Sequence, residues 1–146
     1  MAVRDVIRCQ TLCLAVLTVT GCSSGEDMER MKINQLCSDK PNCVSTIESR
    51  EQFSLSPFRL KTNDINAIKE IALRLPGARL AEESEGYLRI ECVSKIMRFV
   101  DDLELKIDNG NLVVRSESRV GYSDFGVNRK RAETLRTALR EAGITE

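Results

Sequence analysis

One segment near the C-terminus concentrates the side chains that could do chemistry or bind a ligand. It is Arg115-Ser-Glu-Ser-Arg-Val-Gly-Tyr-Ser-Asp-Phe-Gly-Val-Asn-Arg-Lys-Arg131. The segment begins as an extended strand, passes through a glycine-containing loop and places Arg129, Lys130 and Arg131 in the first turn of an expected last helix. Cations at a helix N-terminus oppose the helix dipole by about 0.3–1 kcal/mol each. We therefore expect an anion there, either a carboxylate of the protein or a bound ligand.

The absence of histidine narrows the chemistry that this segment could support. Without histidine, Ser-His-Asp and Cys-His nucleophile systems, imidazole acid-base catalysis and His-ligated zinc are excluded. Asp101 and Asp102 form a carboxylate pair, but neighbouring strand residues point to opposite faces and cannot act on one substrate. An enzyme would have to use Asp101 alone, as a general base with a raised pKa. We expect no catalytic residues, no metal and no cofactor.

A hairpin supplies the frame that positions these residues. Asn109-Gly110 lies between two alternating runs and predicts a two-residue type I′ turn. The turn sets the register of the two strands. The expected pairs are Asp108–Asn111, Ile107–Leu112, Leu105–Val114, Glu104–Arg115, Leu103–Ser116 and Asp101–Ser118.

This register gives the hairpin two unlike faces. The expected inward residues are Phe99, Leu103, Leu105, Ile107, Leu112 and Val114. The expected outer face is charged and consists of Asp102, Glu104, Lys106, Arg115, Glu117 and Arg119. A sheet with one charged face is typical of an antiparallel sheet that is covered on one side only.

Two helices and a further strand complete the expected fold. Apolar residues at three- and four-residue steps predict a helix over residues 65–75, capped by Asn63 or Asp64 and stopped by Pro76-Gly77. Leu88, Ile90 and Cys92 share one face of a strand. The last helix is expected to start near Asn128 as its cap and to end at Gly143. We predict an α+β fold, an antiparallel sheet of about four to five strands with two helices packed on one face.

Asp101 lies on the inward face of this frame although it carries a charge. A half-buried carboxylate must be paired or protonated. Since the chain leaves the same end of the sheet to enter the last helix, acidic and arginine side chains are expected to meet there. The candidate charge cluster or anion-binding site is Asp101, Asp102, Arg115, Arg119, Asp124, Asn128, Arg129 and Arg131.

The N-terminal residues predict an exported, membrane-anchored protein. Arg4 and Arg8 precede an apolar run that is shorter than the roughly 20 residues of a membrane-spanning helix, as in a signal peptide. Val19-Thr20-Gly21-Cys22 then resembles the lipobox of bacterial lipoproteins, which implies cleavage before Cys22 and its acylation. Ser23, rather than aspartate, follows the cysteine, which favours the outer membrane with the domain in the periplasm. We expect a signal peptide over residues 1–21 and a flexible tether over 22–36.

Residues 37–146 are then expected to form a single domain that contains three further cysteines. Cys37 and Cys43 enclose a short loop in a compartment that permits disulfides. A disulfide between them is the favoured interpretation, while free thiols or a metal site remain alternatives. Three thiolates without histidine fall short of the usual four zinc ligands. Cys92 is expected to be a small buried core residue.

Three stretches together resemble one protein family. They are Cys37…Pro41-Asn-Cys-Val-Ser45, Arg98-Phe-Val-Asp-Asp-Leu-Glu104 and Val114–Arg131. The chain is similar over these stretches to the family called domain of unknown function 1499. The resemblance implies a bacterial envelope protein, often a lipoprotein, and no established activity. Ser38 departs from the family pattern, in which the loop more often begins Cys-Pro.

Three functions remain as hypotheses. In the first, the carboxylates neutralise the arginines, so that the cluster is structural and the function is contact with another envelope protein. In the second, the arginine-rich start of the last helix binds a carboxylate, phosphate or lipid headgroup. The third is a histidine-independent hydrolase centred on Asp101. The expected partner in all three is the lipid bilayer through acylated Cys22; with 22 basic and 22 acidic residues, no nucleic acid is expected.

Overall fold

The computed structural model describes residues 31–146, which form one antiparallel sheet and two helices. The predicted signal peptide, Cys22 and most of the predicted tether therefore lie outside the described residues. The elements in chain order are β1 (Cys43–Ser45), β2 (Phe58–Arg59), α2 (Ile65–Ala72), β3 (Ala78–Ser84), β4 (Tyr87–Val93), β5 (Val100–Asp108), β6 (Asn111–Ser118) and α3 (Val127–Glu141). Among these helices, none is long and apolar enough to cross a membrane.

The sheet confirms the predicted hairpin register. β6 pairs with β5 through all six predicted residue pairs, from Asp108–Asn111 at the turn to Asp101–Ser118 at the far end. Asn109 and Gly110 have φ values of 47° and 75°, the positive values that a type I′ turn requires at both central positions. The strand order is β1-β6-β5-β4-β3, and β2 also pairs with β6.

The predicted fold class is confirmed as α+β, with six strands in place of four to five. The additional strands are short: β1 has three residues and β2 has two. Runs of that length are too short to show an alternating pattern, so sequence periodicity does not reveal them. Both strands pair with β6, and they tie the N-terminal part of the domain to the central hairpin.

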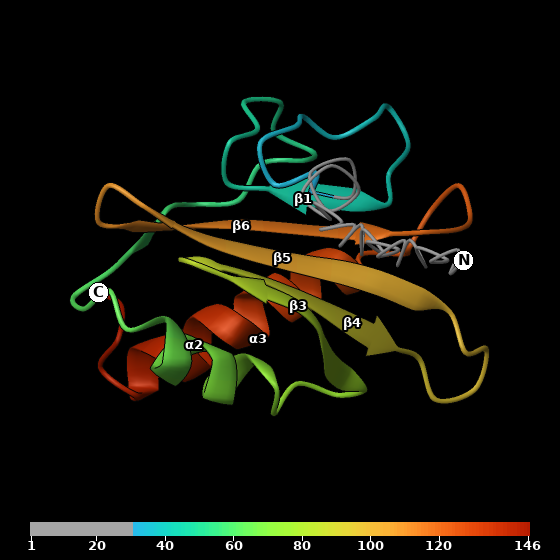
Figure 1. The fold of residues 1–146 in the computed structure, drawn as a ribbon. Helices are drawn as coiled ribbons and strands as arrows, with labels where there is room; N and C mark the ends of the chain where they lie inside the picture. Colours follow the sequence, from blue (N-terminus) through green and yellow to red (C-terminus); the bar gives the residue numbers. More distant parts are fainter. Residues whose placement is uncertain (1–30) are drawn as a thin grey trace, which may run out of the picture.

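Both helices cover the same face of the sheet (Figure 1). Asp64 caps α2 by accepting hydrogen bonds from the backbone N–H groups of Asn66 and Ala67 at 3.0 and 3.1 Å, as the sequence predicts. The helices and the sheet enclose the core. Its fully buried aliphatic residues include Ile68, Leu88, Ile90, Leu103, Leu105, Val114, Leu135 and Leu139. Cys92 is buried among them as a free thiol, in line with the core role predicted for it.

The opposite, charged face is less open than the sequence suggests. The segment of residues 31–36 crosses it: the side chain of Ile33 is fully buried, and the backbone N–H of Lys32 donates to Glu104 at 3.0 Å. Glu104 and Arg115 are only 2% and 3% exposed as a result. Lys32 and Ile33 therefore pack against the sheet, although both fall within the range 22–36 that was expected to be a tether.

Two further expectations are corrected at the end of the sheet where β4 and β6 finish. Phe99, predicted to point inward, precedes β5 and is 49% exposed. The last helix starts at Val127, so Asn128 is its second residue and not its cap. The residue before the helix is Gly126, whose φ of 81° is left-handed. The helix therefore begins at Val127, one residue before the predicted cap Asn128.

Candidate functional site

On the face of the sheet that the helices cover, an ion pair between β5 and α3 joins two members of the predicted cluster. Arg131 donates to Asp101 Oδ2 at 2.6 Å, and both side chains are 11% exposed. The same guanidinium also donates to Ser116 Oγ at 3.0 Å and to Asn128 Oδ1 at 2.6 Å. Asp101 points to this side because it pairs with Cys92 and Ser118, whose side chains face the helices. The inward carboxylate is thus paired, as its burial requires.

Asn128 is the centre of this helix-side cluster. Its side chain is fully buried and forms four polar contacts. It donates to the backbone oxygen of Asn42 at 3.0 Å and to Ser118 Oγ at 2.9 Å, and it accepts from Ser116 Oγ at 2.7 Å and from Arg131. Every polar group of the amide is therefore used to join the N-terminal loop, β6 and α3.

Asp124 takes the capping role that the sequence assigned to Asn128. Its carboxylate accepts from the backbone N–H of Gly126 at 3.0 Å and from that of Asn128 at 2.7 Å. A carboxylate at the N-terminus of a helix also interacts favourably with the positive end of the helix dipole. The anion that the cationic first turn requires is therefore supplied by Asp124 and Asp101 of the protein itself.

The loop between Cys37 and Cys43 contacts the segment that leads into α3. The predicted disulfide is present, with an S–S distance of 2.05 Å. Residues of its loop bond to the segment that follows β6: the backbone N–H of Asp124 donates to Pro41 O at 3.2 Å, and Asn42 Nδ2 donates to Gly121 O at 3.1 Å. The three stretches that carry the family resemblance thus meet in space at one end of the sheet.

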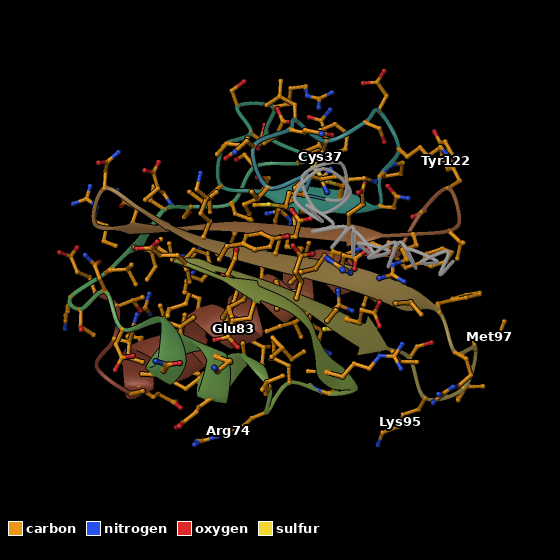
Figure 2. The ribbon with its side chains drawn as sticks, in the orientation of Figure 1. Cys37, Arg74, Glu83, Lys95, Met97 and Tyr122 are labelled. Carbon is orange, nitrogen blue, oxygen red and sulfur yellow. A yellow bond between two sulfur atoms is a disulfide. The ribbon has the colours of Figure 1, made fainter. Side chains whose placement is uncertain are left out.

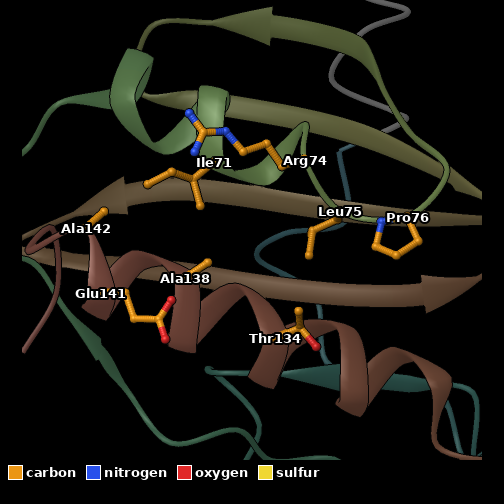
Figure 3. Close-up of a pocket in the computed structure, with 8 residues that line it drawn as sticks. All are labelled: Ile71, Arg74, Leu75, Pro76, Thr134, Ala138, Glu141 and Ala142. Carbon is orange, nitrogen blue, oxygen red and sulfur yellow. The ribbon is translucent and has the colours of Figure 1, made fainter.

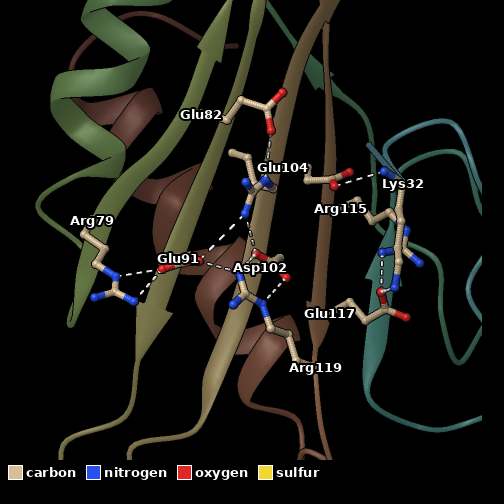
Figure 4. A network of polar contacts seen from close by, with 10 residues as sticks. Lys32, Arg79, Glu82, Glu91, Asp102, Glu104, Arg115, Glu117 and Arg119 are labelled. Atoms are coloured by element: carbon tan, nitrogen blue, oxygen red, sulfur yellow. Dashed lines mark hydrogen bonds and ion pairs between the residues drawn. The ribbon is translucent and has the colours of Figure 1, made fainter. Parts of the chain in front are cut away.

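The other half of the predicted cluster lies on the opposite face of the sheet (Figure 4). Arg119 donates to both oxygens of Asp102, at 2.7 and 2.8 Å, and also to Glu91. Burial opposes ionisation of Asp102, but the hydrogen bond and charge of Arg119, with the charge of Arg89, outweigh it and lower the pKa of this carboxyl. The hydrogen bond from Arg119 likewise lowers the pKa of Glu91. Asp102 and Arg119 are therefore a stable ionised pair.

Arg115 and Arg129 have roles that the sequence did not indicate. Arg115 is buried on the charged face and donates to Glu117 at 2.8 Å. Beside it, burial raises the pKa of Glu104. Arg129 donates to the backbone oxygens of Ser54 and Gln52, at 2.8 and 3.0 Å, and so holds the loop between β1 and β2.

The predicted cluster is therefore two separate networks, one on each face of the sheet. Asp101, Asp124, Asn128 and Arg131 meet on the helix side. Asp102 and Arg119 pair on the charged face, where Arg115 also lies, so the sequence-based grouping of Asp102 with Asp101 is wrong. Consecutive residues of a strand alternate between faces, and the sheet keeps the two networks apart. Among residues 31–146, no group of three or more acidic or cysteine side chains is placed to hold a metal.

Two surface cavities are large enough to consider as binding sites. One of about 380 Å³ lies between α2 and α3, with Ile71, Leu75 and Ala138 among its lining residues and Arg74 and Glu141 at its rim (Figure 3). The other, of about 400 Å³, lies at the end of the sheet beyond β4 and β6. Its lining combines Phe99, Val120, Phe125 and Val127 with the polar residues Ser94, Ser118, Asp101 and Asp124.

Of the two loops that form this second cavity, the one before α3 lies within the Arg115–Arg131 segment, but the sequence patterns did not point to its apolar side chains or to the loop after β4. We call residues 94–99 and 119–127 together the loop end. Seven large apolar side chains are exposed there: Ile96, Met97, Phe99, Val120, Tyr122, Phe125 and Val127. Loop positions have no periodic pattern that would mark them, and Phe99, the one of these seven that the alternation did place, was assigned to the core.

Comparisons with known proteins identify the family of this chain and nothing more specific. No curated protein and no solved structure matches the chain. A family model described as protein of unknown function (DUF1499) matches residues 35–139, a range that holds the disulfide loop, the whole sheet and nearly all of α3. The chain thus belongs to the DUF1499 family of proteins of unknown function.

Proposed function

We propose that this protein is a lipid-anchored, non-catalytic interaction module of the bacterial cell envelope. Acylated Cys22 attaches it to the outer membrane, and the domain of residues 31–146 stands in the periplasm. The charged cluster is structural: it locks α3 and the loop end to the sheet. The surface offered for interaction is the loop end itself.

The observation that carries the proposal is that the cluster's charges are already used within the protein. Asp101 is bound to Arg131 and Asp102 to Arg119, while Asp124 binds two backbone N–H groups. A general base needs a carboxylate that is free to accept a proton from a substrate. The ion pairs remove that freedom, which argues against a hydrolase centred on Asp101.

The same contacts argue against the anion-binding alternative. An anion at the start of α3 would have to displace Asp124 from the backbone N–H groups or Asp101 from Arg131. Phosphate at millimolar concentration is therefore expected to leave the melting temperature unchanged, because a ligand stabilises only the state that binds it. A concentration-dependent rise in melting temperature would favour the anion-binding function over the structural one.

The lipid anchor is tested by metabolic labelling with palmitate in a Gram-negative host. We expect label in the wild-type protein and none in Cys22→Ser, with the labelled protein in the outer-membrane fraction. Cys92→Ser is the matched control, since it also removes one thiol but should leave labelling unchanged. Unlabelled wild-type protein would exclude the anchor.

A further inference from the structure

We propose that the loop end is a second membrane contact, with which the domain lies against the anionic bilayer that holds Cys22. The tips of both loops enter the headgroup region, and the sheet stands away from it. This inference rests on the lipid anchor of the proposed function, and it names the surface that the interaction module contacts.

The first argument is the exposure of apolar surface. Single exposed apolar residues are ordinary in soluble proteins, whereas a contiguous patch marks an interaction surface. Ile96 is 90% exposed and Phe125 is 95% exposed. The two loops adjoin, because Phe99 from one and Val120 and Phe125 from the other line a common cavity. Figure 2 shows Met97 and Tyr122 projecting outward at the same end of the sheet.

The second argument is the backbone conformation that presents these side chains. Phe125 has a φ of 53° and Arg98 a φ of 56°, in the left-handed region that glycine or asparagine adopts at lower cost. Phe125 contributes almost no packing to the fold, since its side chain is exposed. A strained, unpacked aromatic residue has no structural role here and indicates a function outside the fold.

The third argument is charge. Lys95 and Arg98 flank Ile96 and Met97, and residues 94–99 contain no acidic residue. In residues 119–127 the one carboxylate, Asp124, is turned toward the backbone of α3. The loop end therefore presents apolar tips beside basic side chains, the combination that binds the interface of an anionic bilayer. Tyr122 adds an amphipathic ring of the kind enriched at that depth.

The fourth argument is where the chain enters the domain. Lys32 Nζ donates to Glu117 at 3.0 Å, and Glu117 lies two residues before the loop end begins. The chain from Cys22 to Met31 is short, and at about 3.3–3.6 Å per residue it spans at most about 30 Å when fully extended. The chain thus enters over the charged face, where the backbone N–H of Lys32 bonds to Glu104 midway along β5, and a connection of this length leaves the loop end within reach of the bilayer.

Tryptophan reporters test the proposal, because the protein has no tryptophan of its own. The full-length acylated protein is reconstituted into vesicles of phosphatidylethanolamine and phosphatidylglycerol with brominated acyl chains. Phe125→Trp is expected to show blue-shifted emission that the bromines quench. Ile47→Trp is the matched control: the residue is 37% exposed and lies beyond β1, away from the loop end, so the vesicles should neither shift nor quench its emission.

Charge reversal tests the basic flank. Lys95→Glu with Arg98→Glu in the Phe125→Trp background is expected to abolish both blue shift and quenching, while Lys95→Arg with Arg98→Lys retains them. A purely structural role would not respond to the sign of these charges. Tyr122→Trp provides a second reporter that does not depend on the strained residue.

The outcomes separate the two proposals. The mass of the purified protein reports acylation, so an unacylated protein refutes the anchor. If the protein is acylated but the vesicles leave the emission of the Phe125→Trp variant unshifted and unquenched, as they should for the Ile47→Trp control, the membrane contact alone is refuted. If a photo-crosslinker at position 125 links to a protein in intact cells while brominated lipids leave the reporter unquenched, the loop end binds a protein partner and the inference is wrong.

Discussion

Replacing Asp101 by asparagine tests whether the buried pair with Arg131 locks α3 to the sheet. The change keeps the shape of the side chain and removes its charge. Removing one partner of a buried ion pair costs about 3–5 kcal/mol, because the other charge stays buried. Asparagine retains one acceptor oxygen, and Arg131 keeps its hydrogen bonds to Ser116 and Asn128. We therefore expect a loss at the lower end, about 3 kcal/mol of unfolding free energy.

The assay is equilibrium unfolding by urea and by heat, followed by circular dichroism. For a domain of this size, 1 kcal/mol corresponds to about 4 °C, so the melting temperature should fall by about 12 °C. Asp102→Asn is the matched control on the other face. Its partner Arg119 is 40% exposed and keeps Glu91, so this variant should lose only about 1 kcal/mol.

A double-mutant cycle separates the pair from its surroundings. Arg131→Met in the Asp101→Asn background should lose less stability than the two single variants added together, since neither charge is left alone. If Asp101→Asn unfolds at the wild-type temperature, or if the two substitutions are additive, the pair does not lock α3. The structural interpretation of the cluster would then be refuted.

The remaining predictions concern the disulfide and pH. Cys37→Ser with Cys43→Ser should lower the unfolding free energy by about 2 kcal/mol in denaturant titrations, because the bridge closes a short loop; an unchanged midpoint would contradict this. The pKa values of Glu91 and Asp102 are lowered in the folded protein, so their contribution is complete above the unfolded-state values of 4.5 and 3.8 and is lost as pH falls below them. Melting temperatures measured from pH 7 to pH 3 should therefore decline at the acid end, and a flat profile would oppose the assignment. Burial raises the pKa of Glu104, so its ionised form weakens the fold above pH 4.5; Glu104→Gln should melt at or above the wild-type temperature at pH 7, and that difference should shrink at pH 4.

The central hairpin shows what local rules predict well. The turn at Asn109-Gly110 requires positive φ at two positions, and the alternation on either side has a period of two. These constraints act between neighbouring residues, so every predicted pair from Asp108–Asn111 to Asp101–Ser118 is present in the sheet. The cap of α2 at Asp64 is local in the same way.

The candidate site shows where such rules fail. The sequence pattern grouped Asp101 and Asp102 in one cluster because both lie at the same end of one strand. Their true partners depend on elements far away in the chain: Arg131 lies 30 residues after Asp101, and Arg119 lies 17 after Asp102 on the other face. Asn128 was expected to be a cap on the basis of its residue type alone, whereas its side chain joins segments 86 residues apart.

The cover over the charged face of the sheet was missed for a related reason. Alternation in β5 and β6 predicts which side chains point away from the helices, and it does so correctly for Glu104 and Arg115. It does not predict that Ile33 and its neighbours cover them, because that segment has no periodic pattern of its own.

The sequence by itself predicted the fold class and the hairpin register, favoured the disulfide and indicated the family, since each follows from spacing between nearby residues or from a continuous motif. Only the tertiary structure decided how the charges pair, that Asp124 and Asp101 supply the anions at the start of α3, and that seven apolar side chains gather at the loop end. Ion pairing and surface patches depend on distances between residues that are remote in the chain. Those distances exist only once the sheet, the helices and the disulfide loop have packed together.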